Sequence, residues 1–296
     1  MARNVRTRDG RVLAYEQFGD PDGKPVIALH GTPGSRVGPF PREARLHPLG
    51  VRIIAYDRPG YGESARAPGR VVADAAVDVE DLANELGIER FAVVGRSGGG
   101  PHALACAARL PERVTRVAIL ASPAPKDVMG ARWYNDMAEE NADWYRKAEL
   151  GEEEFRESCG EEMERRRRDP ESVMPHNHST LPKTDHPAAL DFGVRSKLVD
   201  TFSEALNNGI DGWVEDVLAF VSPWGFGLAQ LRAPVLIWHG LDDVLSPIGH
   251  LRCLQRQLAG VDPEPEVRLK KDKAHLSAIY AFPALLPWLC YGSRAE

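Results

Sequence analysis

Cysteine is scarce in this sequence, and its few cysteines lie far apart. The four are Cys106, Cys159, Cys253 and Cys290, and no two of them form a C-x-x-C pair. Closely spaced cysteines are typical of disulfide-linked secreted domains and of zinc sites. A chain of 296 residues needs neither disulfides nor zinc for a stable fold, because a protein of this size buries about three quarters of its surface on folding. We therefore expect free thiols in a reducing cytoplasm.

Long apolar runs and a basic excess are absent as well. No apolar run approaches the ~18 residues of a membrane-spanning helix, and no apolar segment follows the basic start MARNVRTRDGRVLAY, as a secretory signal would require. Lys and Arg number 37 against 43 Asp and Glu, a net charge of −6. This balance argues against a dedicated nucleic-acid binder. We expect a cytoplasmic protein with neither membrane nor nucleic acid as partner.

Glycine and proline are abundant, and they are concentrated. The chain has 27 Gly and 23 Pro, whereas average usage gives roughly 36 of the two together. Eleven of them fall within three short windows, 31–34, 59–62 and 95–101. Such clusters mark three loops in which the backbone bends tightly. The excess of glycine and proline therefore does not indicate a collagen-like or low-complexity chain.

Short apolar runs alternate with helical patterns at both ends of the chain. Runs such as Val51–Tyr56 fit strands buried on both faces of a sheet, and Ala73–Leu86 has helical apolar spacing up to Gly87. This alternation predicts a mostly parallel sheet flanked by helices, an α/β fold. Eight strands are expected at 3–7, 11–18, 25–30, 51–56, 91–94, 114–120, 234–238 and 266–270.

The alternation stops near Ser122 and resumes near Gln230. The stretch between contains no convincing buried strand but a charged helical pattern from Glu152 to Asp169 and further amphipathic stretches. We therefore predict a core domain formed by 1–122 and 230–296, and a mainly helical insertion over 123–229.

The most specific motif is Gly95-Arg96-Ser97-Gly98-Gly99, which lies between an expected strand and an expected helix. This is G-x-S-x-G in the strand–turn–helix context of a nucleophile elbow, where the turn exposes the serine hydroxyl. The start of the following helix supplies oriented N–H groups and a partial positive charge. The pattern therefore predicts that Ser97 is a nucleophile.

A serine nucleophile needs a base, and the base needs an acid that orients it. His275 follows the last expected strand, at the edge of the sheet where Ser97 is expected. Asp243, in the loop after the strand at 234–238, is the preferred acid, with Asp242 and Asp127 as weaker alternatives. The order Ser97, Asp243, His275 is that of the α/β hydrolases.

Three further segments complete a resemblance to the α/β-hydrolase fold, in particular to its capped esterases, epoxide-hydrolase-like and proline-iminopeptidase-like enzymes. They are HGTPGS from His30, DRPGYGES from Asp57 and the GxxDxxxP pattern from Gly240. The resemblance implies an eight-stranded, mostly parallel sheet with a helical cap. It also implies an oxyanion hole formed by the backbone N–H groups of Thr32 and Gly98, and it implies no cofactor.

The resemblance also narrows the set of reactions that we expect this protein to catalyse. Epoxide hydrolases and haloalkane dehalogenases carry aspartate at the elbow, which the serine here argues against. Proline iminopeptidases usually carry a bulky aromatic residue after the serine, where this chain has Gly98. We expect a carboxylic ester hydrolase that acts on a small-molecule substrate through a Ser-His-Asp triad. The alternatives are an amide or peptide, lactone or C–C bond hydrolase, and a non-hydrolytic enzyme on the same scaffold.

Aromatic residues of the insertion are the candidates for substrate binding, because a cap lies over the nucleophile. They are Trp133, Trp144, Trp213 and Trp224.

A metal site is not expected. His176, His178, Asp185 and His186 crowd one segment, but their spacing matches no zinc template.

Overall fold

The computed structural model describes residues 3–41, 43–173 and 181–293. An eight-stranded sheet lies at its centre, with the strand order β1-β2-β4-β3-β5-β6-β7-β8. The pairs β1–β2 and β2–β4 are antiparallel, and all the others are parallel. The strands are β1 Arg3–Arg6, β2 Val12–Gly19, β3 Lys24–Leu29, β4 Val51–Tyr56, β5 Phe91–Arg96, β6 Val114–Leu120, β7 Val235–Gly240 and β8 Glu266–Lys270. The predicted fold class is confirmed.

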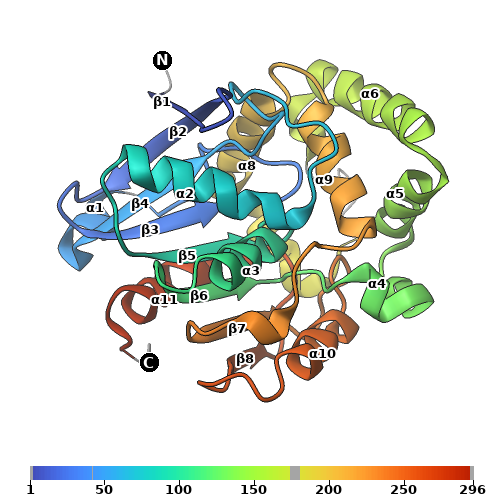
Figure 1. Ribbon diagram of the computed structural model, residues 1–296. Helices are drawn as coiled ribbons and strands as arrows, with labels where there is room; N and C mark the ends of the chain where they lie inside the picture. The colour runs from blue at the N-terminus through green and yellow to red at the C-terminus, as the bar shows by residue number, and fades with distance from the viewer. Residues whose placement is uncertain (1–2, 42, 174–180, 294–296) are drawn as a thin grey trace.

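Helices cover both faces of the sheet (Figure 1). Helices α2 (Ala75–Glu85), α3 (Gly99–Arg109) and α10 (Ile248–Gln257) contribute to the apolar cluster on one face. Helices α1 (Glu43–Leu46) and α11 (Ala278–Tyr291) contribute to the cluster on the other face. Neighbouring residues of β3 divide between the two clusters: Ile27 packs on the first face and Val26 on the second. This is why the strand reads as an unbroken apolar run.

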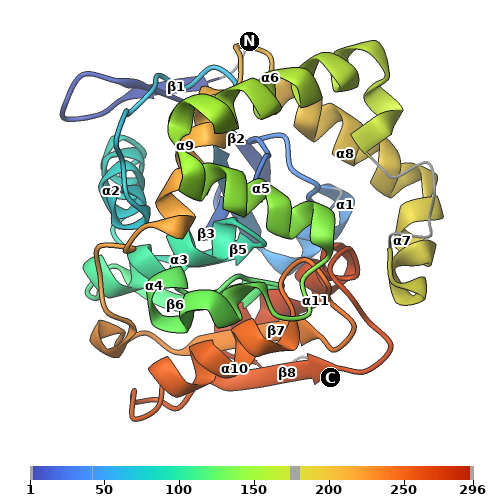
Figure 2. The same cartoon turned by 90° about the vertical axis from the view of Figure 1, so that its right-hand side faces the viewer.

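Between β6 and β7 the chain forms helices, as the sequence predicts. Helices α5, α6, α8 and α9 gather beyond one end of the sheet (Figures 1 and 2). Their division into a separate domain over 123–229 stays a prediction. The α-helices of the segment are α4 Lys126–Met129, α5 Glu139–Leu150, α6 Glu152–Arg168, α7 His186–Leu190, α8 Phe192–Ala205 and α9 Asp211–Val221.

This segment has an apolar cluster of its own, and that cluster joins it to the core. Phe155 of α6 and Trp213 of α9 are buried there together with Tyr61, which belongs to the loop after β4. Packing against Tyr61 fixes α9 over the carboxyl ends of the central strands, where the site described next is found.

Two further observations on the described ranges concern membrane-spanning helices and cysteines. None of the helices described has the length and apolar character needed to cross a membrane. All four cysteines lie within the described part of the chain and all are free.

Candidate active site

Ser97 lies in a sharp turn between β5 and α3. Its φ is 54°, a left-handed conformation that is uncommon for a residue with a side chain. Its N–H donates to the Leu120 carbonyl at 2.8 Å, and its carbonyl accepts from Gly100 N–H at 2.9 Å, so both neighbouring elements hold the turn. A Cβ on Gly95 would lie 2.8 Å from Gly100 N. Only glycine therefore allows strand and helix to approach this closely.

His275 and Asp243 form a buried pair beside this turn. His275 Nδ1 lies 2.9 Å from Asp243 Oδ2 and 3.2 Å from Oδ1. The same carboxylate accepts the N–H groups of Leu245 and Ser246, both at 2.8 Å. Burial raises the pKa of Asp243, but the charge of His275 and its hydrogen bond outweigh burial, and the net pKa is lowered. The carboxylate therefore stays ionised, and Nδ1 is the imidazole nitrogen that bonds to it.

The two alternative acids lie elsewhere. Asp242 is half-buried and its N–H donates to the Lys273 carbonyl at 3.0 Å. Asp127 is exposed on α4. Of the three candidate carboxylates, Asp243 is the one that bonds to His275.

Asp185 holds the loop that carries His275. It lies at the end of a 3-10 turn, Lys183–Asp185, and is 1% exposed. Its carboxylate accepts the N–H of Leu276 at 2.9 Å and that of Ser277 at 3.0 Å. The sequence suggested Asp185 only as part of a histidine-rich segment. His176 and His178 of that segment lie outside the described residues, and the described ranges hold no cluster of three or more potential metal ligands.

Thr32 and Gly98 lie against each other next to Ser97. A Cβ on Gly98 would lie 2.8 Å from Thr32 Cβ and even nearer to its hydroxyl. Neither backbone N–H donates to any group in the described part of the chain. Two adjacent, unoccupied donors beside a serine are what an oxyanion needs.

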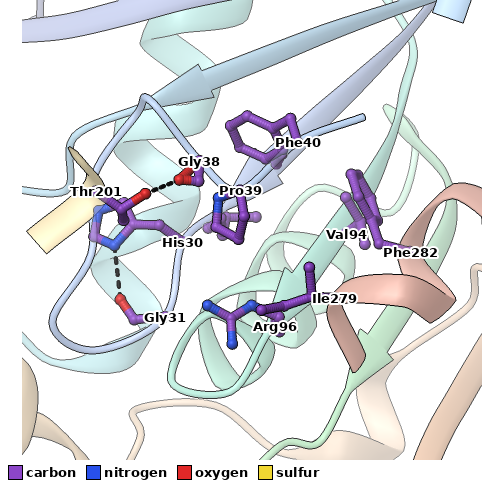
Figure 3. Close-up of a pocket in the computed structure, with 12 residues that line it drawn as sticks. His30, Gly31, Gly38, Pro39, Phe40, Val94, Arg96, Thr201, Ile279 and Phe282 are labelled. Atoms are coloured by element: carbon purple, nitrogen blue, oxygen red, sulfur yellow. Dashed lines mark hydrogen bonds between the residues drawn. The ribbon is translucent and has the colours of Figure 1, made fainter. Parts of the chain in front are cut away.

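His30 anchors this loop rather than reacting. Its Nδ1 bonds to the Gly31 carbonyl at 2.8 Å (Figure 3), and its Nε2 accepts the N–H of Arg58 at 3.1 Å. Burial, followed by the charge of Arg58, holds the pKa of His30 well below its usual value. His30 is therefore neutral, with both ring nitrogens engaged.

Asp216 of α9 fastens the helical segment to the same loop, and it was not among the residues predicted from the sequence. Its carboxylate accepts from the hydroxyls of Thr32 at 2.7 Å and Tyr61 at 2.9 Å. It also pairs with Arg58 and, at 2.7 Å, with Arg70. Burial raises its pKa, but the two arginines outweigh burial and hold the pKa well below the usual value. The only sequence signal was a pair of adjacent acids, Glu215 and Asp216, within the otherwise apolar run WVEDVLAFV.

Two ion pairs hold the loop after β4. Asp57 pairs with Arg36, and Arg58 pairs with Asp216. Both are structural ion pairs, but each joins the loop to a different element.

A cavity of about 590 Å³ opens between the sheet and the helical segment, and Ser97 and His275 both line it. Of the four tryptophans expected there, Trp144 and Trp213 line the cavity. Trp133 and Trp224 do not. Trp133 is fully buried, and its indole N–H donates to the Ala124 carbonyl at 2.7 Å. Trp224 packs on Phe226, with ring centroids 6.0 Å apart.

Charged residues also line this cavity, and sequence reasoning did not single them out. Arg166 of α6 lies over the rings of Phe202 at 4.7 Å and Trp213 at 5.4 Å. Arg96, the residue before the nucleophile, lines it from the sheet side.

Residues 24–277 match the family model described as the alpha/beta hydrolase fold. The chain therefore belongs to the α/β hydrolase fold family, as the elbow, the histidine–acid pair and the sheet order indicate.

Curated relatives cover a smaller part of the chain. It is 41% identical over 115 residues to a proline iminopeptidase of Xylella fastidiosa and 36% identical over 115 residues to one of Arabidopsis thaliana. Each match covers 38% of this chain, and 36% and 30% of the two relatives, so it spans about a third of their length.

Solved structures share the whole fold at low identity. A hydrolase from Pseudomonas aeruginosa has a TM-score of 0.66 at 19% identity, over 97% of both chains. A thermophilic esterase from Thermogutta terrifontis has a TM-score of 0.62 at 23% identity, over 97% of this chain and 95% of that one. These likenesses establish the fold alone.

Proposed function

We propose that the protein is a serine hydrolase that cleaves a carboxylic ester of a small molecule through an acyl-enzyme on Ser97. One observation carries the proposal. Ser97, in a strained turn, and His275, which bonds to the buried Asp243, line the same cavity. A hydroxyl in an exposed elbow, an imidazole and a carboxylate that orients it are the parts that nucleophilic acyl transfer requires.

In the first half of the proposed reaction, Ser97 Oγ attacks the ester carbonyl carbon while His275 Nε2 takes the hydroxyl proton. Asp243 holds the imidazole through Nδ1 and stabilises the imidazolium. The N–H groups of Thr32 and Gly98 receive the negative charge that develops on the carbonyl oxygen. Collapse of the tetrahedral intermediate expels the alcohol, which takes the proton from His275.

In the second half, water replaces the alcohol. His275 accepts a proton from the water as the oxygen attacks the acyl carbon, and the carboxylic acid leaves as Ser97 regains its proton. The low pKa of Asp243 keeps it an acceptor throughout neutral pH.

Peptide-bond cleavage is the second candidate, and the identity to proline iminopeptidases favours it. Two features of the site favour the ester instead. Gly98 abuts Thr32, so the bulky aromatic residue expected after the serine of such peptidases has no room. The cavity also carries Arg96, which flanks Gly31 together with Ser97. Its charge repels a protonated amino group close to the scissile bond, which is where an aminopeptidase must bind one.

The test compares p-nitrophenyl butyrate with prolyl-p-nitroanilide as substrates. We expect turnover of the ester to exceed that of the anilide, and Ser97→Ala to lose about 10⁴-fold or more in kcat. Ser203→Ala, at an exposed position on α8, is the matched control and should retain activity. A fluorophosphonate probe should label Ser97, as read by peptide mass. Unchanged turnover in Ser97→Ala would refute the nucleophile, and faster anilide cleavage would favour the peptidase.

A further inference from the structure

Arg96 is a guanidinium without a partner. It forms no hydrogen bond or ion pair with any residue in the described ranges, and none of its nitrogens is sealed from water. Other arginines near the site behave differently, since Arg36, Arg58 and Arg70 each pair with at least one carboxylate. Burial lowers the pKa of Arg96 to about 10, so the side chain remains a cation at neutral pH.

This cation lies next to the nucleophile. The position that a Cβ would take on Gly31 is 3.6 Å from Arg96 Nη2 and 3.5 Å from Ser97 Cβ. The guanidinium and the nucleophilic side chain therefore flank the same point of the Gly31 loop. A group bound by Arg96 is only a few bonds from a carbonyl carbon that Ser97 can attack.

Arg96 lines two spaces. One is the large catalytic cavity, and the other is a small pocket of about 30 Å³. Figure 3 shows the guanidinium pointing toward Gly31, with Ile279, Val94 and Phe282 around the small pocket. A space of this size holds one or two water molecules, which is also about the size of a carboxylate.

No acid within the described ranges forms an ion pair with Arg96. Among the residues that line the small pocket there is no Asp or Glu. The glutamates of the large cavity, Glu139 and Glu140, are exposed at the start of α5 on the opposite, helical side, and Glu139 pairs with Arg146. The guanidinium lines the cavity and is free to bind an anion that enters it. We therefore look for the partner of Arg96 in the substrate.

We propose that Arg96 binds a carboxylate of the substrate, so that the ester cleaved at Ser97 also carries a free carboxylate a few bonds from the scissile carbonyl. This inference rests on the proposed ester hydrolysis and names its substrate class. The planar guanidinium suits a carboxylate, which it binds through two parallel N–H···O bonds. Binding that distal charge would position the carbonyl over Ser97.

Two pairs of esters test the proposal, each matched in length. Monomethyl glutarate against methyl valerate places the carboxylate on the acyl side, and 4-acetoxybutanoate against butyl acetate places it on the alcohol side. For each pair the measured quantity is the ratio of kcat/KM, charged over neutral, followed by acid release. For the wild type we expect this ratio to be about ten or more in one of the two pairs, because hydrogen bonds to a charged group are strong.

The variants are Arg96→Gln, Arg96→Lys and, as control, Arg146→Gln. Arg96→Gln should lower the ratio about 10- to 100-fold, chiefly through KM of the charged ester. Arg96→Lys should restore part of it, because the charge returns without the planar fork. Arg146→Gln removes the same charge from an exposed side chain of α5 and should leave the ratio as in the wild type. Because each ratio is taken within one variant, general damage to the active site cancels.

A binding measurement separates this inference from the proposed function. Glutarate is titrated calorimetrically into Ser97→Ala and into Ser97→Ala/Arg96→Gln. Heat of binding with Ser97→Ala and none with the double variant supports the carboxylate site, even if no ester is hydrolysed. If no ester is hydrolysed, only the proposed ester hydrolysis is refuted. Ser97-dependent cleavage with no preference for either charged ester overturns the inference and leaves the hydrolase standing, as does equal binding of glutarate to both proteins.

Discussion

Gly98 faces Thr32 so closely that a side chain at position 98 would collide with that of Thr32. A Cβ on Gly98 would lie 2.8 Å from Thr32 Cβ and 3.0 Å from Phe220 Cζ. The two residues that we propose as oxyanion donors are thus coupled by packing as well as by function. Gly98 has no positive φ to explain it, so the close approach accounts for the glycine.

Gly98→Ala should therefore displace Thr32 and impair the reaction. We expect kcat/KM for an ester to fall about 100-fold, the cost of misplacing one oxyanion donor. Thr32→Gly in the Gly98→Ala background removes the obstructing side chain and should recover part of the loss in a double-mutant cycle. Gly160→Ala, within α6 and with open space around it, is the control and should be neutral or slightly stabilising. A strictly additive cycle would contradict the coupling.

Asp243→Asn should abolish most of the turnover while preserving the fold. An amide cannot enforce the tautomer in which His275 Nδ1 bears the proton, so we expect kcat to fall about 10⁴-fold. Asp242→Asn is the matched neighbour, with no bond to His275, and should keep kcat near the wild-type value. Steady-state kinetics on a p-nitrophenyl ester compare the two. A larger loss for Asp242→Asn would reverse the assignment of the acid.

Asp216→Asn should destabilise the protein in a pH-dependent way. Removing the charge leaves Arg58 and Arg70 without their shared buried carboxylate, which costs about 3–5 kcal/mol in the free energy of unfolding. The pKa of Asp216 lies well below its usual 3.8 in the folded state. Its stabilisation is therefore complete above that value and lost as the pH falls below it.

Urea unfolding of wild type and Asp216→Asn at pH 7 and pH 3 measures this effect. The difference between the two proteins should shrink at the lower pH. Asp200→Asn, exposed on α8 and paired with Lys197 only at 3.9 Å, should change stability by less than about 0.5 kcal/mol at both. A difference for Asp216→Asn that does not depend on pH would contradict the assigned pKa shift.

The tryptophans should divide into two classes. Trp144→Ala and Trp213→Ala enlarge the cavity and should change the relative kcat/KM of short and long acyl esters. Trp133→Ala, within the core, should cost about 3–5 kcal/mol of stability without changing that preference. Melting curves and a series of p-nitrophenyl esters separate the classes. A preference altered by Trp133→Ala would place that side chain closer to the substrate than its burial indicates.

Local pattern was enough to predict the sheet and the elbow. The run Val51–Tyr56 is a strand with those bounds, because burial on both faces leaves a continuous apolar signature. The elbow at Ser97 follows from glycines whose spacing permits close approach of strand and helix. Such features depend on neighbours in the sequence and can be read from it.

Long-range pairing was not predictable in the same way. Arg58 is adjacent to Asp57 in sequence, yet its partner is Asp216, 158 residues away. Arg96 occupies a variable position of the G-x-S-x-G motif. Only the folded structure shows that its guanidinium pairs with no carboxylate of the described residues. Charge pairing is decided by which side chains the fold brings together, and one sequence does not specify that.

Through Asp216 and Asp185, the helical segment supports the reaction centre in addition to covering it. One bonds to the hydroxyl of Thr32, and the other to the backbone that follows His275. The segment is therefore not an interchangeable cover. An engineer who grafts the corresponding segment of another hydrolase onto this sheet, to import a new specificity, would also remove two supports of the reaction centre. Such a chimera should keep its activity only if it retains carboxylates at both positions.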